Sequence, residues 1–82
     1  MDNKVLIDLV VPEIDLQYDI YLPINKKIGG VIKLLVKSIN EENGTDIDFK
    51  LLYNADTGEC YDYNMLIANT NIRNGTRLVL IR

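Results

Sequence analysis

Histidine is absent from this chain of 82 residues, and serine and cysteine occur once each, as Ser38 and Cys60. Catalytic serines and cysteines are usually activated by a histidine base, which this chain cannot supply. The acidic residues are scattered through expected turns, and their pattern indicates no pocket that would raise the pKa of a carboxyl group. We therefore predict that the protein is not an enzyme.

A single cysteine excludes a disulfide bond within the chain, which favours a reducing, intracellular environment. We interpret Cys60 as a small residue, buried or half-buried in a short strand, rather than as a redox site. The reason is that no neighbouring residues in the sequence would lower its pKa.

Long apolar runs are also missing. The first residues, MDNKVLIDLVV, contain too short an apolar run for a secretory signal, and an acidic residue interrupts it. No stretch approaches the roughly 20 apolar residues that span a bilayer. We expect a cytoplasmic protein that does not insert directly into a membrane.

Basic residues are outnumbered, with 9 Lys and Arg against 12 Asp and Glu and a net charge of −3. Binding to phosphates needs a concentrated basic surface, so this balance argues against nucleic acid as a partner. Asp46 with Asp48, and Asn54 with Asp56, place oxygen ligands at alternate positions but lack the spacing and final glutamate of an EF-hand loop. We predict neither a metal site nor a cofactor.

Alternation of apolar and polar residues predicts a hairpin at the start of the chain. In 4–11 one face carries Val5, Ile7, Leu9 and Val11, and in 16–22 one face carries Leu16, Tyr18, Ile20 and Leu22. Pro12 and Glu13 separate the two runs. Two such neighbouring runs indicate antiparallel strands with one buried face.

The apolar spacing then becomes helical, at Ile28, Val31, Ile32, Leu35 and Ile39. We predict a helix from about 26 to 42, with Asn25 as the N-cap and Gly44 just beyond its last turn. Further strands are expected at 47–53 and, briefly, within 59–63. An irregular crossing or single helical turn follows, and then a last strand from Arg77.

This order predicts an α+β fold in one domain, residues 1–82. The helix has one apolar stripe and should pack across one face of a mixed sheet of four to five strands. The first and last strands would pair in parallel at the centre of the sheet, which is the β-grasp arrangement.

Several spacings resemble ubiquitin over nearly the full chain. Leu22 followed by Ile28, Val31 and Leu35 repeats ubiquitin's spacing from its second strand into its helix, and Ile72 followed by Leu78 and Leu80 repeats the spacing into its last strand. Within this superfamily the segments YLPINKKIGGVIKLL and LLYNADTGECYDYNMLIANTNIRNGTRLVLI are similar to the small YukD-like proteins of Gram-positive type VII (ESX-like) secretion systems.

The resemblance implies a cytoplasmic accessory or regulatory protein whose partners are components of the secretion system. The sequence stops at Arg82 without the terminal Gly-Gly of conjugated relatives, so we expect it not to be conjugated. Two alternatives stay open. The chain could be a regulatory domain of a larger secretion membrane protein, or a β-grasp carrier if the native chain extends to Gly-Gly.

The face of the sheet away from the helix is the preferred binding surface. We expect Phe49, Leu51, Leu78 and Leu80 to point toward the helix. The expected binding residues on the other face are Leu52, Val79 and Ile81, with Lys50 and Arg82 beside them. Exposed apolar clusters on small proteins tend to be interaction surfaces. Binding of another protein, formation of a homodimer, and no role beyond the strand itself all remain open.

The predicted start of the helix is unusual. Glycine costs about 1 kcal/mol relative to alanine inside a helix, yet Gly29 and Gly30 follow Lys26 and Lys27 here. The glycines could allow close packing or a tight start. Alternatively, the exposed amides and the two lysines could contact an acidic partner surface or a phosphate. The pattern is not that of a P-loop.

Overall fold

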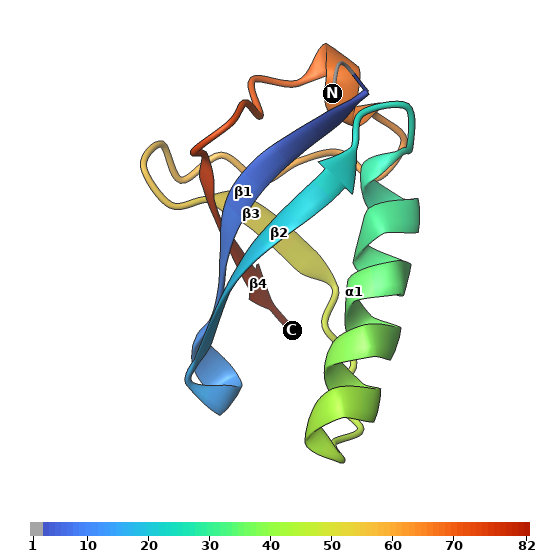
Figure 1. The fold of residues 1–82 in the computed structure, drawn as a ribbon, viewed down its shortest axis with the longest axis vertical. Helices are drawn as coiled ribbons and strands as arrows, with labels where there is room; N and C mark the ends of the chain where they lie inside the picture. The colour runs from blue at the N-terminus through green and yellow to red at the C-terminus, as the bar shows by residue number, and fades with distance from the viewer. Residues whose placement is uncertain (1–2) are drawn as a thin grey trace.

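The computed structural model of the protein describes residues 3–82 and confirms the predicted α+β class. Its elements are β1 (Lys4–Val11), β2 (Leu16–Pro23), α1 (Ile28–Asn43), β3 (Leu51–Asn54) and β4 (Arg77–Ile81), with short 3-10 turns at Pro12–Ile14 (η1) and Ile67–Asn69 (η2). The four strands form one mixed sheet in the order β2-β1-β4-β3, and α1 lies across one of its faces (Figure 1).

The first and last strands lie side by side at the centre of the sheet, as predicted. β1 and β4 run parallel, and Leu9 is paired with Leu78. Both side chains are completely buried. β2 pairs antiparallel with β1 over all eight residues, and β3 pairs antiparallel with β4.

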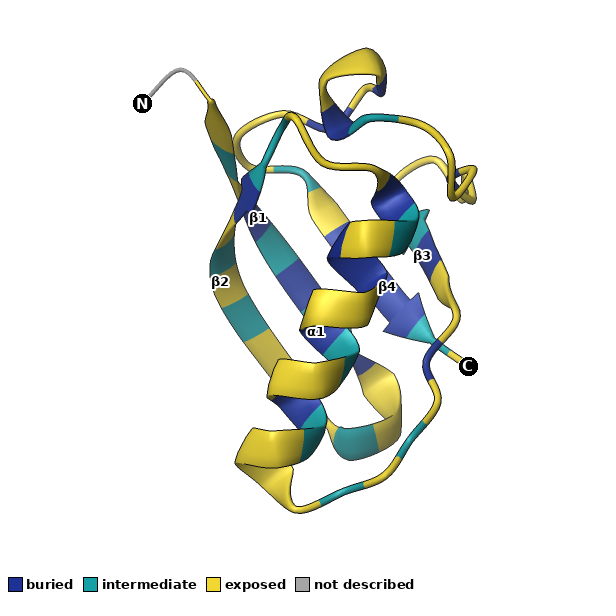
Figure 2. Ribbon diagram, turned by 90° about the vertical axis from the view of Figure 1, so that its right-hand side faces the viewer, coloured by how far each residue is buried: buried dark blue, intermediate teal, exposed yellow. Residues whose placement is uncertain are grey.

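The buried residues of α1 and of the sheet form one hydrophobic core, and Figure 2 shows where they lie along these elements. The predicted period-two positions of β1 supply Ile7, Leu9 and Val11, each at most 1% exposed. α1 contributes the predicted stripe, namely Ile28, Val31, Ile32, Leu35 and Ile39. Because both patterns converge on one cluster, the burial of apolar area fixes which face of each element points inward.

The helix starts later than predicted, and its N-cap is Lys27 rather than Asn25. No side chain caps it. Instead, the amide of Ile28 donates to the carbonyl of Met65 (2.9 Å), and that of Gly29 to the carbonyl of Tyr63 (3.0 Å). A distant segment therefore satisfies the amides that an N-cap side chain usually serves. At the other end Gly44 is left-handed, with φ of 63°, and closes the helix as predicted.

The third strand is shorter than predicted, and the predicted directions of Leu51 and Leu52 are wrong. Leu52 is 1% exposed and packs in the core with Phe49, whereas Leu51 is 39% exposed. Leu51 is paired with Ile81, and the amide of Lys50 also donates to the carbonyl of Ile81 (2.9 Å). Two residues thus face one, as in a β-bulge, which interrupts the alternation between Phe49 and Leu52.

The segment after β3 crosses back without a further strand. It forms two isolated bridges, Tyr53 with Cys60 and Leu66 with Lys27. Cys60 is exposed, so its predicted burial is wrong. Tyr61 is the buried residue. Its hydroxyl donates to Asn71 Oδ1 (2.6 Å) and accepts from Asn54 Nδ2 (3.2 Å). Burial raises the pKa of Tyr61 above its ordinary value.

The corrected β3 register gives a matched stability test. Leu52→Ala should lower the free energy of unfolding by about 2–5 kcal/mol, because it leaves a cavity in the core. Leu51→Ala should lower it by about 0.5 kcal/mol or less, because that side chain is partly solvated. Urea unfolding followed by circular dichroism measures both. Equal losses, or a larger loss for Leu51→Ala, would contradict this register.

Candidate protein-binding site on the outer face of the sheet

The outer face is the face of the sheet that points away from α1. The strand register gives its residues directly, because paired residues in neighbouring strands share a face. It consists of Leu6, Asp8 and Val10 on β1, Gln17, Asp19 and Tyr21 on β2, Leu51 and Tyr53 on β3, and Arg77, Val79 and Ile81 on β4.

At the β3 side, this face carries a continuous apolar group that we name the β3–β4 patch, formed by Val10, Leu51, Tyr53, Val79 and Ile81. Leu51 is the most exposed of the patch's aliphatic side chains, and Ile81, Tyr53 and Val10 are half-buried. Val79 is only 7% exposed. It lies on a central strand between Val10 and Tyr53, which are its register partners on either side, so it forms the floor of the patch rather than its surface.

Of the predicted binding residues, the structure places two on this patch, Val79 and Ile81. Leu52 is in the core, as described above. Lys50 lines a hollow with the helix residues Gly29, Ile32 and Lys33, on the α1 flank, although its main chain adjoins the patch at Ile81. Arg82 follows β4, and its Nε donates to Glu13 Oε2 (2.7 Å).

Sequence reasoning missed Leu51, Tyr53 and Val10. The turn at the end of β3 could have shown which residues of this strand face outward. The side-chain oxygen of Asn54 accepts the amides of Asp56 (2.9 Å) and Thr57 (3.2 Å), a turn typical of asparagine. Counting back from this buried turn residue in steps of two reaches Leu52, and that places Leu51 and Tyr53 on the opposite face.

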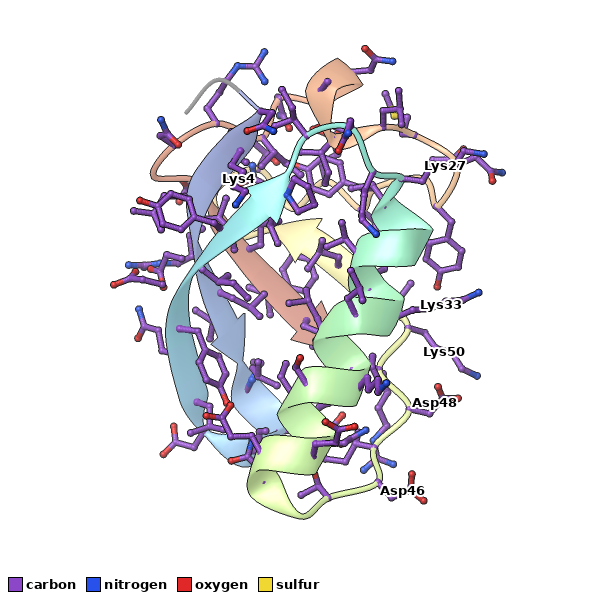
Figure 3. All side chains as sticks on the ribbon, turned by 45° about the vertical axis from the view of Figure 1, so that its right-hand side comes forward. Lys4, Lys27, Lys33, Asp46, Asp48 and Lys50 are labelled. Carbon is purple, nitrogen blue, oxygen red and sulfur yellow. The ribbon has the colours of Figure 1, made fainter. Side chains whose placement is uncertain are left out.

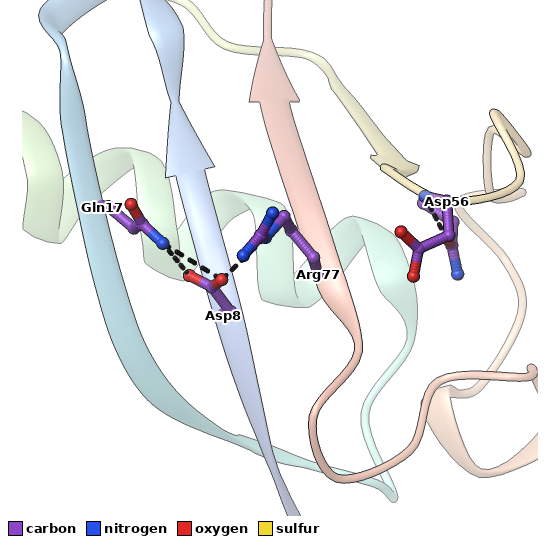
Figure 4. A network of polar contacts seen from close by, with 5 residues as sticks. Asp8, Gln17, Asp56 and Arg77 are labelled. Atoms are coloured by element: carbon purple, nitrogen blue, oxygen red, sulfur yellow. Dashed lines mark hydrogen bonds and ion pairs between the residues drawn. The ribbon is translucent and has the colours of Figure 1, made fainter.

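A polar network crosses the middle of the outer face (Figure 4). Asp8 lies between Gln17 and Arg77: its carboxylate accepts Gln17 Nε2 (2.9 Å) and Arg77 Nε (2.8 Å). The hydrogen bond from Gln17 and the contact with Arg77 hold the pKa of Asp8 below its ordinary value. This network separates the β3–β4 patch from the exposed Leu6 and Tyr21.

The second predicted region is the start of α1. Lys26, Lys27 and Gly30 are exposed, and Gly29 is half-buried. A Cβ on Gly29 would lie 3.3 Å from both the Cβ and the carbonyl oxygen of Tyr63, whereas a Cβ on Gly30 would meet nothing within 4 Å. Gly29 therefore serves close packing, one of the two structural interpretations given by the sequence.

Two amides at this helix start already have main-chain partners. Ile28 and Gly29 donate to main-chain carbonyls, and Ile67 and Ala68 donate in turn to the carbonyls of Lys26 and Ile24 (3.0 and 2.8 Å). The bonds of Ile28 and Gly29 occupy two of the donors that a phosphate would need. The lysines remain accessible: Figure 3 shows Lys27, Lys33 and Lys50 along the α1 flank of the molecule.

Among residues 3–82, no three His, Cys, Asp or Glu side chains lie close enough together to hold a metal ion. The only α-helix in that range, α1, is neither long nor apolar enough to cross a membrane.

No protein-family model matches the sequence, and no curated protein matches it. Solved structures do match. The ubiquitin-like domain of EccD5 from Mycobacterium xenopi has a TM-score of 0.74 and 21% identity, over 94% of this chain and 91% of that one. The protein has the ubiquitin-like β-grasp fold. This confirms the resemblance to ubiquitin-like proteins that the sequence indicates.

The same β-grasp fold occurs as part of a longer chain and in a chain of a monooxygenase complex. A chain of the MycP5-free ESX-5 inner membrane complex matches with a TM-score of 0.75 and 18% identity, over 95% of this chain but only 20% of that one. A chain of the toluene 4-monooxygenase HD complex matches with a TM-score of 0.77 and 9% identity, over 94% and 95% of the two chains. The protein therefore spans about a fifth of the ESX-5 chain that it resembles. At these identities the matches establish the fold alone.

The two glycines of α1 allow a matched test of the close packing. Gly30→Ala should raise the free energy of unfolding by up to about 1 kcal/mol, because alanine favours a helix and the site is open. Gly29→Ala should give no gain or a loss, because the new methyl group would press on the backbone of Tyr63. Urea unfolding compares the two variants. An equal gain for both would contradict the packing role of Gly29.

The Asp8 network gives a pH-dependent test. The pKa of Asp8 is lower in the folded protein, so its contribution to stability is present above the unfolded value of about 3.9 and is lost as the pH falls through the folded value. Asp8→Asn should therefore lower the melting temperature at pH 7, and the difference from the parent protein should diminish as the pH falls through the folded pKa of Asp8.

Asp19→Asn is the control for this test. Asp19 lies directly opposite Asp8, so this substitution removes a like charge that faces the Asp8 carboxylate. Its melting temperature at pH 7 should equal or exceed that of the parent. A loss for Asp8→Asn that persists unchanged at low pH would show that the effect is not ionic.

Proposed function

We propose that this domain is a non-catalytic protein-binding module of a type VII secretion system. It acts in the cytoplasm as an accessory or regulatory component of the YukD-like kind. Its fold is shared with the ubiquitin-like domain of EccD5, and its sequence resembles YukD-like proteins in YLPINKKIGGVIKLL. The observation that carries the binding role is the β3–β4 patch on the outer face of the sheet.

The patch has the physical make-up of a docking surface. Leu51 protrudes at 39% exposure, Ile81 and Tyr53 stand beside it, and Val79 closes the floor beneath them. Covering apolar surface contributes about 25 cal/mol per Å² before the costs of association. Tyrosine is one of the residue types enriched among those that dominate binding.

Polar residues frame this apolar centre. The ion pair of Arg82 with Glu13 lies at one end, and the ion pair of Arg77 with Asp8 (2.8 Å) lies toward the middle of the sheet. Interfaces between proteins commonly have this arrangement of an apolar centre and a polar rim. The exposed Lys26 and Lys27 would provide a secondary contact for an acidic region of the partner.

A second candidate is a regulatory domain within a larger secretion membrane protein. The match to a chain of the ESX-5 inner membrane complex favours it, because this chain covers only 20% of that chain. The same patch would then bind a neighbouring subunit of the assembly. Self-association through the patch is a third possibility, and a measurement of the protein's mass in solution separates it from these two functions.

Leu51→Asp and Ile81→Asp should each reduce capture of the partner by about tenfold or more, because a carboxylate would be buried without a counter-ion. The measurement is affinity purification of the tagged protein from its own cells, with quantification of secretion-system subunits by mass spectrometry.

Ala68→Asp is the matched control, since it adds the same charge on the exposed η2 turn. It should leave capture unchanged. Undiminished capture by Leu51→Asp would count against the patch, and absence of secretion-system subunits from the purified parent protein would count against the system. A mass of two chains for the parent, reduced to one by Leu51→Asp, would identify the patch as a dimer interface.

A further inference from the structure

The two edges of the sheet differ. At the β3 edge, the chain itself covers the strand: the amide of Asn54 donates to the carbonyl of Glu59 (2.9 Å), and the amide of Tyr61 donates to the carbonyl of Leu52 (3.2 Å). At the β2 edge, no strand of residues 3–82 is paired with β2 on the side away from β1. An uncovered edge presents main-chain donors and acceptors that a further strand can bind.

The hydrogen bonds of β1 show which residues of β2 point to the open edge. The amide of Leu6 donates to Asn74 Oδ1 (2.8 Å), and its carbonyl accepts the amide of Gly75 (2.8 Å), so the main chain of Leu6 faces away from β2. Its register partner Tyr21 is therefore in a non-hydrogen-bonded pair. Alternate residues behave alike, so the amides and carbonyls of Gln17, Asp19 and Tyr21 point outward.

A shallow apolar groove of about 120 Å³ adjoins this edge, between β2 and α1. Its lining includes Ile20, Leu22, Val31, Leu34, Leu35 and Ser38. Leu34 is 50% exposed, although it lies on a helix whose other large aliphatic residues are mostly buried. A strand added to β2 would direct every second side chain into this groove.

Charge at the edge favours one kind of strand. Asp19 is exposed at the middle of the three outward residues and already lies opposite Asp8 on β1. A second copy of β2, paired antiparallel about Asp19, would place the Asp19 carboxylates of the two copies face to face, which is destabilising. A foreign strand with a lysine or arginine at that position would instead form an opposite-charge pair.

We propose that an extended segment of a partner protein adds to the open edge of β2 as a fifth, antiparallel strand. Its apolar residues enter the groove beside Leu34, and a basic residue between them lies opposite Asp19. The antiparallel direction follows from the greater stability of antiparallel pairing. This surface lies apart from the β3–β4 patch, and the proposal does not depend on the function assigned to that patch.

The test uses the peptide acetyl-Val-Thr-Val-Lys-Val-Thr-Val-amide, titrated into the isotope-labelled full chain and followed by NMR. We expect saturable shifts at Gln17, Asp19, Tyr21 and Leu34, with slower hydrogen exchange of the Asp19 amide. Replacing the peptide lysine by glutamate should weaken binding about threefold or more. Asp19→Lys should reverse that preference. Its exposed position should leave the fold intact, which the dispersion of the same spectra checks.

Two N-methylated peptides separate strand addition from simple apolar adhesion. In the antiparallel register the lysine amide points at β2, whereas the amides of the valines beside it point away. N-methylation of the lysine should weaken binding by about tenfold or more, and N-methylation of the third-position valine should have little effect.

The proposal is overturned if the peptide with the N-methylated lysine binds as well as its parent, or if the shifts centre on Leu51 and Ile81. It is also overturned if the amide of Asp19 is protected by a dimer of the free protein. Leu51→Asp should bind the peptide as the parent does, so failure at β2 and failure at the β3–β4 patch are distinguishable.

Discussion

The parallel pairing of β1 with β4 is the contact on which the rest of the structure depends. Leu9 and Leu78 are paired and completely buried at the centre of the sheet. β2 and β3 join this central pair from outside, and α1 covers its inner face. Without it, the hairpin would have no neighbour on its second side, and β3 would have no strand to pair with. The outer face is equally a product of this pairing, because it brings Val10 beside Val79 and Asp8 beside Arg77.

Polar contacts of the crossing segment between β3 and β4 connect the end of β3, the approach to β4 and the start of α1. The buried hydroxyl of Tyr61 links Asn54 at the end of β3 to Asn71 near the start of the last turn. The same segment also supplies the carbonyls that receive the first amides of α1. Main-chain bonds from this one irregular segment thus do the work of a side-chain cap at the start of α1. They also take the place of a fifth strand at the edge of β3. One consequence is the asymmetry of the sheet, whose β3 edge is closed while its β2 edge stays open.

Much of the fold could be predicted from the sequence, because apolar periodicity and burial agree over β1, β2 and α1. The buried stripe of the helix is the predicted one, and Gly44 takes the predicted left-handed conformation. The prediction was wrong where long-range contacts decide a local feature. Lys27, not Asn25, begins the helix, because Met65 and Tyr63 provide the acceptors. Cys60 is exposed because it takes part in an isolated bridge and not in a strand, and the neighbouring Tyr61 takes the buried position.

The candidate site was predicted in place but not in all its residues. The outer face and Ile81 follow from the alternation in the last strand. The sequence places Leu52 on the wrong face, because the alternation of apolar and polar residues does not reveal the β-bulge in which two residues face Ile81. The shielding of Val79 could not be read from the sequence either, since it depends on neighbours from β1 and β3.

The position of β4 in the chain has a consequence for synthesis. Asp8 and Arg77, which meet across the central pair, are 69 residues apart in sequence. As the chain leaves the ribosome, the hairpin and α1 emerge first, and one apolar side of the nascent hairpin stays without its partner until the final strand is made. Contacts of such long separation slow the closing step. The growing chain therefore passes through a stage in which this apolar surface is available to chaperones.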